Sequence, residues 1–252
     1  MRTVFATILV VCATITTAWG QQTEARRPSV SVLLTKIQSP EEEGVVEAFY
    51  QLRSSPTALR NSAVKAALID LLDRENRASD QMRRAGGAGE SEGDDEYMGD
   101  LVSTVASFAD WSNPRQACIL VISGALPAEK YAEHAKTSIP CLLTRSKSDL
   151  GLERRQAVEL LVEVLANKKT GLDSTMIETC KQVIKMALRD PDDGVRIGTV
   201  HALAEFGGED MIPALKQVSI SDPYVGKESD GFWVREYATQ AIEAIQQRAS
   251  QH

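Results

Sequence analysis

Apolar residues recur at helical spacing along most of the chain after Pro40. Four stripes follow an i, i+3, i+4 or i+7 pattern: Val45, Val46, Phe49 and Leu52; Leu101, Val105 and Phe108; Ile177, Cys180, Ile184, Ala187 and Leu188; and Met211, Leu215 and Val218. This period is typical of amphipathic helices that bury one face. Between Pro127 and Thr144 the pattern is irregular, because Pro140 interrupts it. The pattern predicts a succession of helices joined by short polar breaks.

A second pattern recurs five times: an Arg is followed three residues later by a small or β-branched residue and six residues later by an apolar one. The copies are Arg60 with Ala63 and Ala66, Arg115 with Cys118 and Val121, Arg154 with Ala157 and Leu160, Arg196 with Thr199 and Ala202, and Arg235 with Ala238 and Ala241. The last four arginines are roughly 40 residues apart, a period typical of helix-pair repeats that stack into a solenoid. We expect residues 40–252 to form one all-α repeat domain.

The clearest copy runs from Arg189 to Gly208 and begins RDPDDGVR. Its Pro fixes φ, and its Asp side chains suit the capping of amides at the start of the next helix. The segment resembles the turn and second helix of a HEAT-like repeat, of the type also found in phycobilin lyases. The resemblance implies a right-handed α-solenoid of about five HEAT-like helix pairs, in which the repeat Arg pairs with a turn Asp, here Asp190 or Asp192.

The resemblance covers roughly residues 40–245 and is specific in the last two repeats. Residues 224–232 are inserted between the turn at Asp222 and the helix that carries Arg235, and Glu153 stands where an apolar residue is expected. A calcium loop is the alternative interpretation of the acidic turn at Asp190 and Asp192. The Gly and the distal Glu of an EF-hand are missing there, so turn capping is preferred.

In such a solenoid the Arg-bearing helices are expected to line the concave side. The exposed positions of the last two helices are therefore our candidates for partner binding, together with two neighbouring aromatic residues: His201, Glu205, Phe232, Trp233, Tyr237 and Gln240. Aromatic residues are enriched at interface hot spots. The alternative is ordinary solvent exposure for each residue, and a role for Trp233 in packing the end of the domain.

Motifs for catalysis are missing from the sequence. We find no nucleophile elbow, phosphate-binding loop or paired His ligands, and the three histidines, His134, His201 and His252, are scattered. The chain is therefore predicted to be a non-enzymatic scaffold that binds a protein partner, with no cofactor and no metal. A lyase-like or chaperone-like protein acting on a small molecule or a cofactor-bearing protein is the alternative, and a structural role in an envelope complex is a third.

The composition agrees with this class of protein. Aromatic residues make up only 5% of the chain, which suits helix packing better than strands. The formal net charge is -7, so a nucleic-acid partner is not expected, since such surfaces need clustered basic residues.

The first 20 residues predict a secretory signal peptide. Arg2 precedes an apolar run from Val4 to Thr17, and small residues at Ala18 and Gly20 predict cleavage before Gln21. The mature chain is then expected to be extracytoplasmic, either periplasmic or secreted, and without a membrane span. A retained anchor and a lipoprotein are the alternatives, but the run is shorter than a bilayer requires and Cys12 lies too deep inside it.

Two polar segments interrupt the predicted helices. Residues 21–39 form an N-terminal polar segment with a few apolar docking residues, and residues 85–96 are rich in Gly, Asp and Glu and are expected to form a mobile loop. Loose collection of a cation by this loop is a weaker alternative.

Cleavage of the signal peptide would leave Cys118, Cys141 and Cys180 in a compartment that permits disulfides. Burial of Cys118 and Cys180 as small apolar side chains is one interpretation. A bridge between Cys141 and Cys180, whose separation is close to one repeat, is the other.

Overall fold

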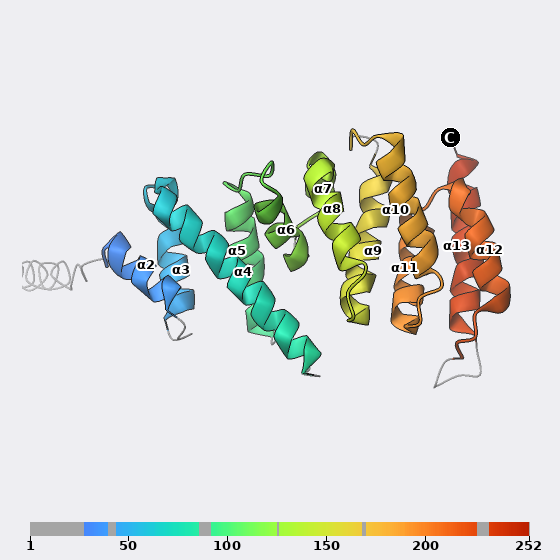
Figure 1. The fold of residues 1–252 in the computed structure, drawn as a ribbon, viewed down its shortest axis with the longest axis horizontal. Helices are drawn as coiled ribbons and strands as arrows, with labels where there is room; N and C mark the ends of the chain where they lie inside the picture. Colours follow the sequence, from blue (N-terminus) through green and yellow to red (C-terminus); the bar gives the residue numbers. More distant parts are fainter. Residues whose placement is uncertain are drawn as a thin grey trace, which may run out of the picture. The chain divides into compact units, whose positions relative to one another are not determined.

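The computed structural model describes residues 28–39, 44–85, 92–124, 126–167, 170–225 and 232–251. The predicted signal peptide lies outside these residues. The described residues contain helices and no strand, which confirms the all-α prediction (Figure 1). The described residues divide into two compact units, one that ends at Val64 and one that begins at Lys65.

The first unit is a small helix pair. Helix α2 (Val30–Gln38) packs against α3 (Val45–Arg53), and the short 3-10 helix η1 (Ala58–Arg60) follows. Its buried residues are Leu33, Ile37, Val45, Ala48, Phe49, Leu52 and Ala58. Residues 30–38, within the predicted polar segment, are thus helical, and two of the apolar residues they contain are buried.

The second unit holds the rest of the helices. Helix α4 (Ser62–Arg84) begins in the first unit and lies mostly in the second. It is followed by α5 (Glu92–Ala106), α6 (Pro114–Ser123), α7 (Ala128–Glu133), α8 (Ala135–Arg145), α9 (Gly151–Ala166), α10 (Ser174–Ala187), α11 (Asp193–Phe206), η2 (Glu209–Met211), α12 (Ile212–Ser221) and α13 (Trp233–Ala249).

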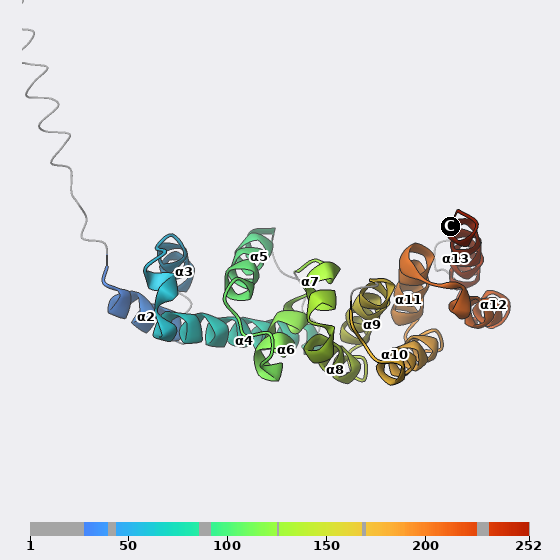
Figure 2. The same ribbon diagram turned by 90° about the horizontal axis from the view of Figure 1, so that it is seen from above.

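From α8 onward the second unit is a stack of helices in two rows. Helices α9, α11 and α13 lie side by side in one row, and α8, α10 and α12 form the other (Figures 1 and 2). One apolar core, which extends from Val121 to Ile245, joins the two rows. Each helix pair therefore buries its stripe against the next pair, as the solenoid prediction requires.

The repeat pattern is clearest from the third Arg onward. Ala157, Thr199, Ala202, Ala238 and Ala241 are all buried, and each lies three or six residues after a repeat Arg. The first copy is wrong in register, since Ala63 and Ala66 are exposed. The side chain of Asn61 accepts a hydrogen bond from the Ala63 amide at 2.8 Å and so caps α4, which leaves Arg60 outside the helix.

Two local predictions need correction. Helix α5 begins at Glu92, so residues 92–96 of the predicted loop 85–96 are helical, while residues 86–91 lie outside the described part of the chain. Pro140 lies inside α8 rather than between helices. The break in this region falls at His134, between α7 and α8.

The cysteine prediction is also corrected. Cys118 on α6 and Cys141 on α8 form a disulfide, with their Cα atoms 5.5 Å apart. Cys180 is free and fully buried, and burial raises the pKa of its thiol to about 11. The predicted bridge between Cys141 and Cys180 is therefore wrong. The expected burial of Cys180 is confirmed, whereas Cys118 is half-buried and bonded.

Candidate functional site

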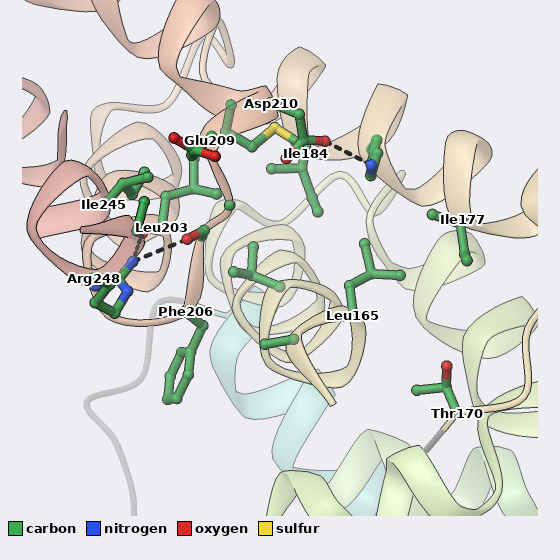
Figure 3. A pocket seen from close by; sticks show the side chains of 17 residues that line it. Leu165, Thr170, Ile177, Ile184, Leu203, Phe206, Glu209, Asp210, Ile245 and Arg248 are labelled. Carbon is green, nitrogen blue, oxygen red and sulfur yellow. Dashed lines mark hydrogen bonds and ion pairs between the residues drawn. The ribbon is translucent and has the colours of Figure 1, made fainter. Parts of the chain in front are cut away.

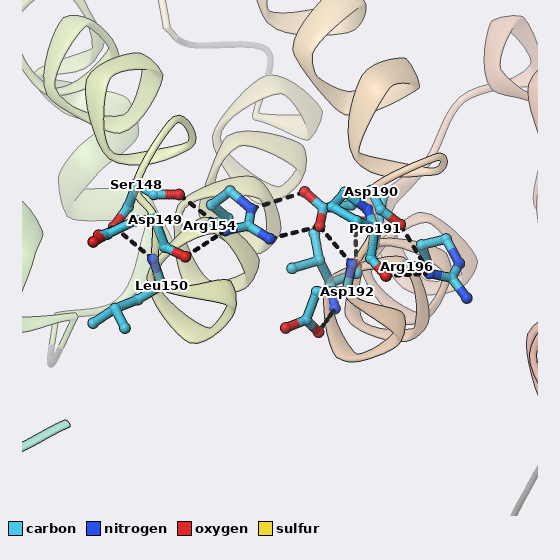
Figure 4. Close-up of polar contacts among 10 residues, drawn as sticks. Ser148, Asp149, Leu150, Arg154, Asp190, Pro191, Asp192 and Arg196 are labelled. Carbon is cyan, nitrogen blue, oxygen red and sulfur yellow. Dashed lines mark hydrogen bonds and ion pairs between the residues drawn. The ribbon is translucent and has the colours of Figure 1, made fainter. Parts of the chain in front are cut away.

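Arginines in successive turns link one repeat to the next. Arg154 donates two hydrogen bonds to Asp190, from Nε at 2.8 Å and from Nη2 at 2.7 Å (Figure 4). Arg196 repeats the arrangement with Asp222, at 2.7 Å and 3.3 Å. The expected pairing of a repeat Arg with a turn Asp is therefore found at Asp190, but the carboxylate that pairs with Arg196 is that of Asp222 in the following turn, not Asp190 or Asp192.

The same arginines also bind carbonyl oxygens of their own turns. Arg154 donates to Ser148 and Asp149, at 2.9 Å and 3.0 Å, and Arg196 donates to Asp190 and Pro191, at 2.8 Å and 3.3 Å (Figure 4). Each guanidinium thus holds its own turn and the next turn at once. Paired, charge-assisted hydrogen bonds of this kind are stronger than neutral ones.

The repeat arginines before and after these two, Arg115 and Arg235, make only part of this set of hydrogen bonds. Arg235 donates to the carbonyl oxygen of Asp222 at 2.6 Å, while Arg115 pairs with Asp70 and Asp73 at 3.2 Å on an exposed surface. Asp192 accepts a hydrogen bond from the Val195 amide at 3.3 Å, which confirms its predicted role as a helix cap.

The electrostatic balance at Asp190 favours its ionised form. Burial raises the pKa of this carboxyl group, but hydrogen bonds from Arg154 and the Asp192 amide, together with nearby positive charge, outweigh burial and hold the pKa below its ordinary value. The side chains of Arg154 and Asp190 are 15% and 12% exposed, so the pair is largely withdrawn from water.

Two of the predicted partner-binding residues meet across neighbouring repeats. The rings of His201 on α11 and Tyr237 on α13 lie with centroids 4.5 Å apart and tilted by 50°. Glu205 follows His201 by one turn and Gln240 follows Tyr237 by almost one turn, and both are exposed. The structure therefore brings these four residues onto one surface of the row formed by α9, α11 and α13, which we call the Arg-helix row.

The two other aromatic candidates lie at the start of α13. The Arg235 guanidinium lies 3.9 Å from the centroid of the Phe232 ring, and Phe232 is 38% exposed. Trp233 is half-buried as the first residue of the helix. Arg235 links this end of α13 to the turn at Asp222, because it also donates to the Asp222 carbonyl oxygen.

The sequence analysis missed acidic residues on the neighbouring helix α9. Glu163 lies nine residues after Arg154, the same offset that separates Glu205 from Arg196, so the repeat alignment could have identified it. Burial raises the pKa of Glu163, and repulsion from Glu205, Glu129 and Glu159 raises it further. Glu159 pairs with Arg155 at 2.8 Å, whereas Glu163 stands among like charges.

A hollow of about 690 Å³ lies at the C-terminal ends of α9 and α11. Leu165 and Ile177 line one side of it, and Leu203 and Ile245 line the other (Figure 3). Three of its charged groups have protein partners: Lys181 pairs with Asp210 at 2.6 Å, and Arg248 donates to the carbonyl oxygens of Ala204 and Gly207. The hollow offers an apolar lining with fixed charges along its edge.

A second hollow, of about 580 Å³, adjoins the first. It is lined by Gly124, Leu126, Pro127, Glu129, Leu160, Glu163, Ala166, Asn167 and Phe206. Ala166 and Phe206 line both hollows. We call the two hollows together the trough.

The described residues offer neither a metal site nor a membrane span. No group of three or more His, Cys, Asp or Glu side chains there is arranged to hold a metal ion. Among the described helices none combines the length and the apolar character needed to cross a membrane.

Comparison with known proteins gives fold-level similarity only. No protein family matches this chain, and no curated protein sequence matches it. Among solved structures, the chain is similar to an engineered protein, with 16% identity, a TM-score of 0.46, and coverage of 86% of this chain and 96% of the other. It is also similar to a designed armadillo repeat protein in complex with the peptide (KR)4, with 16% identity, a TM-score of 0.39, and coverage of 86% and 100%. Computationally designed armadillo repeat proteins for modular peptide recognition give 14% identity, a TM-score of 0.37, and coverage of 86% and 99%.

Proposed function

We propose that this chain is a non-enzymatic scaffold that binds a protein partner through the Arg-helix row. The observation that carries the proposal is the contact between the exposed His201 and the half-buried Tyr237, which joins side chains of successive repeats into one surface. Histidine and tyrosine present apolar ring faces with polar tips, a combination suited to protein contacts.

The turns support the proposal, because they make this surface rigid. Arg154 and Arg196 each tie two successive turns together at the ends of the helices that form the row. A surface held in one shape before binding loses less conformational entropy when the partner arrives. We infer from the same Arg-containing turns that the repeats are of the HEAT-like type.

We further propose that the mature chain is exported. The apolar run after Arg2 supports this, and so does the disulfide between Cys118 and Cys141, because disulfides persist mainly in oxidising compartments. Intact-mass measurement of the protein secreted by its source cells tests both points. We expect a chain that begins at Gln21 and contains one titratable thiol after unfolding, that of Cys180; a chain that retains Met1 or carries three free thiols contradicts the proposal.

Site-specific photo-cross-linking tests the scaffold. A photoreactive phenylalanine analogue replaces Gln240 on the Arg-helix row or, as a matched control, Met186 on α10 of the other row, which is 71% exposed. In the source cells we expect one protein adduct from position 240 that is absent from position 186. Equal adducts from both positions, or none from position 240, would contradict binding through the row.

The larger hollow favours a second candidate function, the binding of a small apolar molecule. Its volume of about 690 Å³ falls in the range of ligand sites, and apolar side chains such as Leu165, Ile177 and Ile245 line it beside the charged groups. Native mass spectrometry of the purified protein distinguishes the two functions. A co-purifying small molecule that is lost on changing Ile177→Asp would favour this candidate over the scaffold.

A further inference from the structure

The two hollows of the trough are adjacent. Ala166 and Phe206 line both of them, so a ligand that extends past these two side chains can contact both hollows. Together they extend from Pro127, before α7, to Arg248 on α13. A trough of this kind suits an extended chain better than a compact small molecule.

The two hollows of the trough differ in charge. In the smaller hollow the carboxyl groups of Glu129 and Glu163 lie beside the apolar side chains of Leu126 and Leu160. Glu205 of α11 is near enough to repel Glu163. The larger hollow has two basic side chains, Lys181 and Arg248, and two acidic ones, Glu209 and Asp210, so its charges balance. A positive charge on the ligand is therefore most favourable at the smaller hollow.

We infer that the trough binds an extended protein segment that carries a Lys or Arg side chain beside Glu163 and an apolar side chain in the larger hollow. This inference rests on the proposed scaffold function, because it names the partner segment that the row of α9, α11 and α13 recognises. The basic side chain would relieve the repulsion among Glu129, Glu163 and Glu205, while the apolar side chain would leave water for the lining of Leu165, Ile177 and Leu203.

Labelled synthetic peptides test the inference by fluorescence anisotropy. Each peptide of the panel has one Leu and one Lys on a Gly-Ser background, and the separation of the two residues varies across the panel. Matched panels replace Lys by Glu or Leu by Ser. We expect one separation to bind saturably, with a Kd below about 1 mM, and both replacements to weaken that peptide by about tenfold or more.

Three protein variants locate the bound peptide. Glu163→Gln keeps the shape of the trough and should weaken the Lys peptide by about fivefold, whereas Glu96→Gln, an exposed change on α5, should leave its affinity unchanged. Ala166→Trp fills the part that both hollows share and should abolish binding. Ala166 is the exposed last residue of α9, so this variant should remain folded, and circular dichroism checks that it does.

The results separate this inference from the scaffold proposal. If no peptide binds, if the Lys and Glu panels bind equally, or if Glu163→Gln and Ala166→Trp bind like the unaltered protein, the trough is not the site. An adduct from position 240 together with any of these results would support the scaffold proposal and show that the trough does not bind the partner segment. Peptide binding without an adduct would keep the trough as a peptide site and overturn only the claim that the partner contacts the surface around Gln240.

Discussion

At the scale of single residues, two acidic side chains of one turn differ in their contribution to the fold. Asp190 receives two hydrogen bonds from Arg154 and one from the Asp192 amide, whereas Asp192 caps α11 through one bond to Val195. The first side chain is largely buried with its partner and the second is exposed. Stability should therefore depend on the two residues to different degrees.

Asp190→Ala should lower the free energy of unfolding by about 3 kcal/mol, because it leaves the guanidinium of Arg154 without its carboxylate in a site with little water. Asp192→Ala should cost about 1 kcal/mol, the usual effect of losing a helix cap. Urea denaturation followed by circular dichroism measures both. Equal losses would show that the Arg154 pair contributes no more than a cap.

The same pair predicts a dependence of stability on pH. Since the pKa of Asp190 is lower in the folded protein than its ordinary value, the pair stabilises the fold above about pH 4. This contribution should be lost as the pH falls through the folded pKa. Repeating the denaturation across the acid range should show a smaller loss for Asp190→Asn than for the unaltered protein.

Ionised Glu163 affects stability in the opposite direction to ionised Asp190, because the pKa of Glu163 is raised in the folded state. Its ionised form therefore destabilises the fold at neutral pH, and this penalty disappears below the pKa of an unfolded glutamate. Glu163→Gln should stabilise the protein by about 0.5 kcal/mol at neutral pH, the size expected when repulsion between like charges one helical turn apart is removed, and by nothing in acid. The urea midpoints of Glu163→Gln and the unaltered protein, measured at neutral and at acid pH, test this prediction. An equal gain in stability at both pH values would contradict it.

At the scale of the helices, a glycine fixes the end of α11. A Cβ atom on Gly207 would lie 2.5 Å from the backbone oxygen of Leu203, and backbone atoms cannot move aside as the tip of a side chain can. Gly207 also accepts a hydrogen bond from Arg248 through its carbonyl, at 2.9 Å. The close approach shapes one wall of the larger hollow.

Gly207→Ala should therefore lower the free energy of unfolding by about 2 kcal/mol. The matched change Gly99→Ala lies inside α5, where a Cβ atom would meet nothing within 4 Å. It should raise the free energy by about 0.5–1 kcal/mol through helix propensity. Chemical denaturation of both variants gives the comparison, and destabilisation by both changes would point to a cause other than the contact with Leu203.

Sequence patterns predicted the helices well where one stripe of residues decides the burial. The pattern predicted the helices after Arg154, Arg196 and Arg235 correctly, because the small residues that it places after each Arg are buried in the structure. The prediction at Arg60 was wrong, since Asn61 caps α4 and shifts the start of this helix. The spacing of apolar residues does not predict where a capping residue begins a helix.

Features that depend on contacts between distant residues could not be read from spacing. The bond between Cys118 and Cys141 follows from the packing of α6 against α8, which no local pattern contains. For the same reason the pairing of Arg196 with Asp222, 26 residues further along the chain, was not predicted. Of the candidate surface, the residues on α11 and α13 were named in advance, but the acidic residues on α7 and α9 were not.

At the scale of the second unit, helices contact their neighbours along the stack, so stability should be distributed locally. Ala241→Asp places a carboxylate at a fully buried position of α13, which should cost about 4 kcal/mol or more. Hydrogen exchange should then accelerate in α12 and α13 and, less strongly, in α11, while α6 and α8, joined by the disulfide, keep their protection.

The exposed position Thr239 on the same helix supplies the control. Thr239→Asp adds the same charge to α13 without burying it, and its exchange rates should stay close to those of the unaltered protein. Faster exchange throughout residues 65–252 in Ala241→Asp would show that the unit unfolds as one body.

The arginine pairing has a consequence for how such a chain can change in length. The repeat of α10 and α11 receives a guanidinium at Asp190 and supplies one from Arg196 to the turn at Asp222. If a copy of this repeat were inserted directly after the original, its Asp190 would pair with Arg196 of the original. Its own Arg196 would pair with Asp222, and no new mutation would be needed. Gene duplication can therefore lengthen this part of the protein, because each new contact between repeats would have its Arg–Asp pair at once.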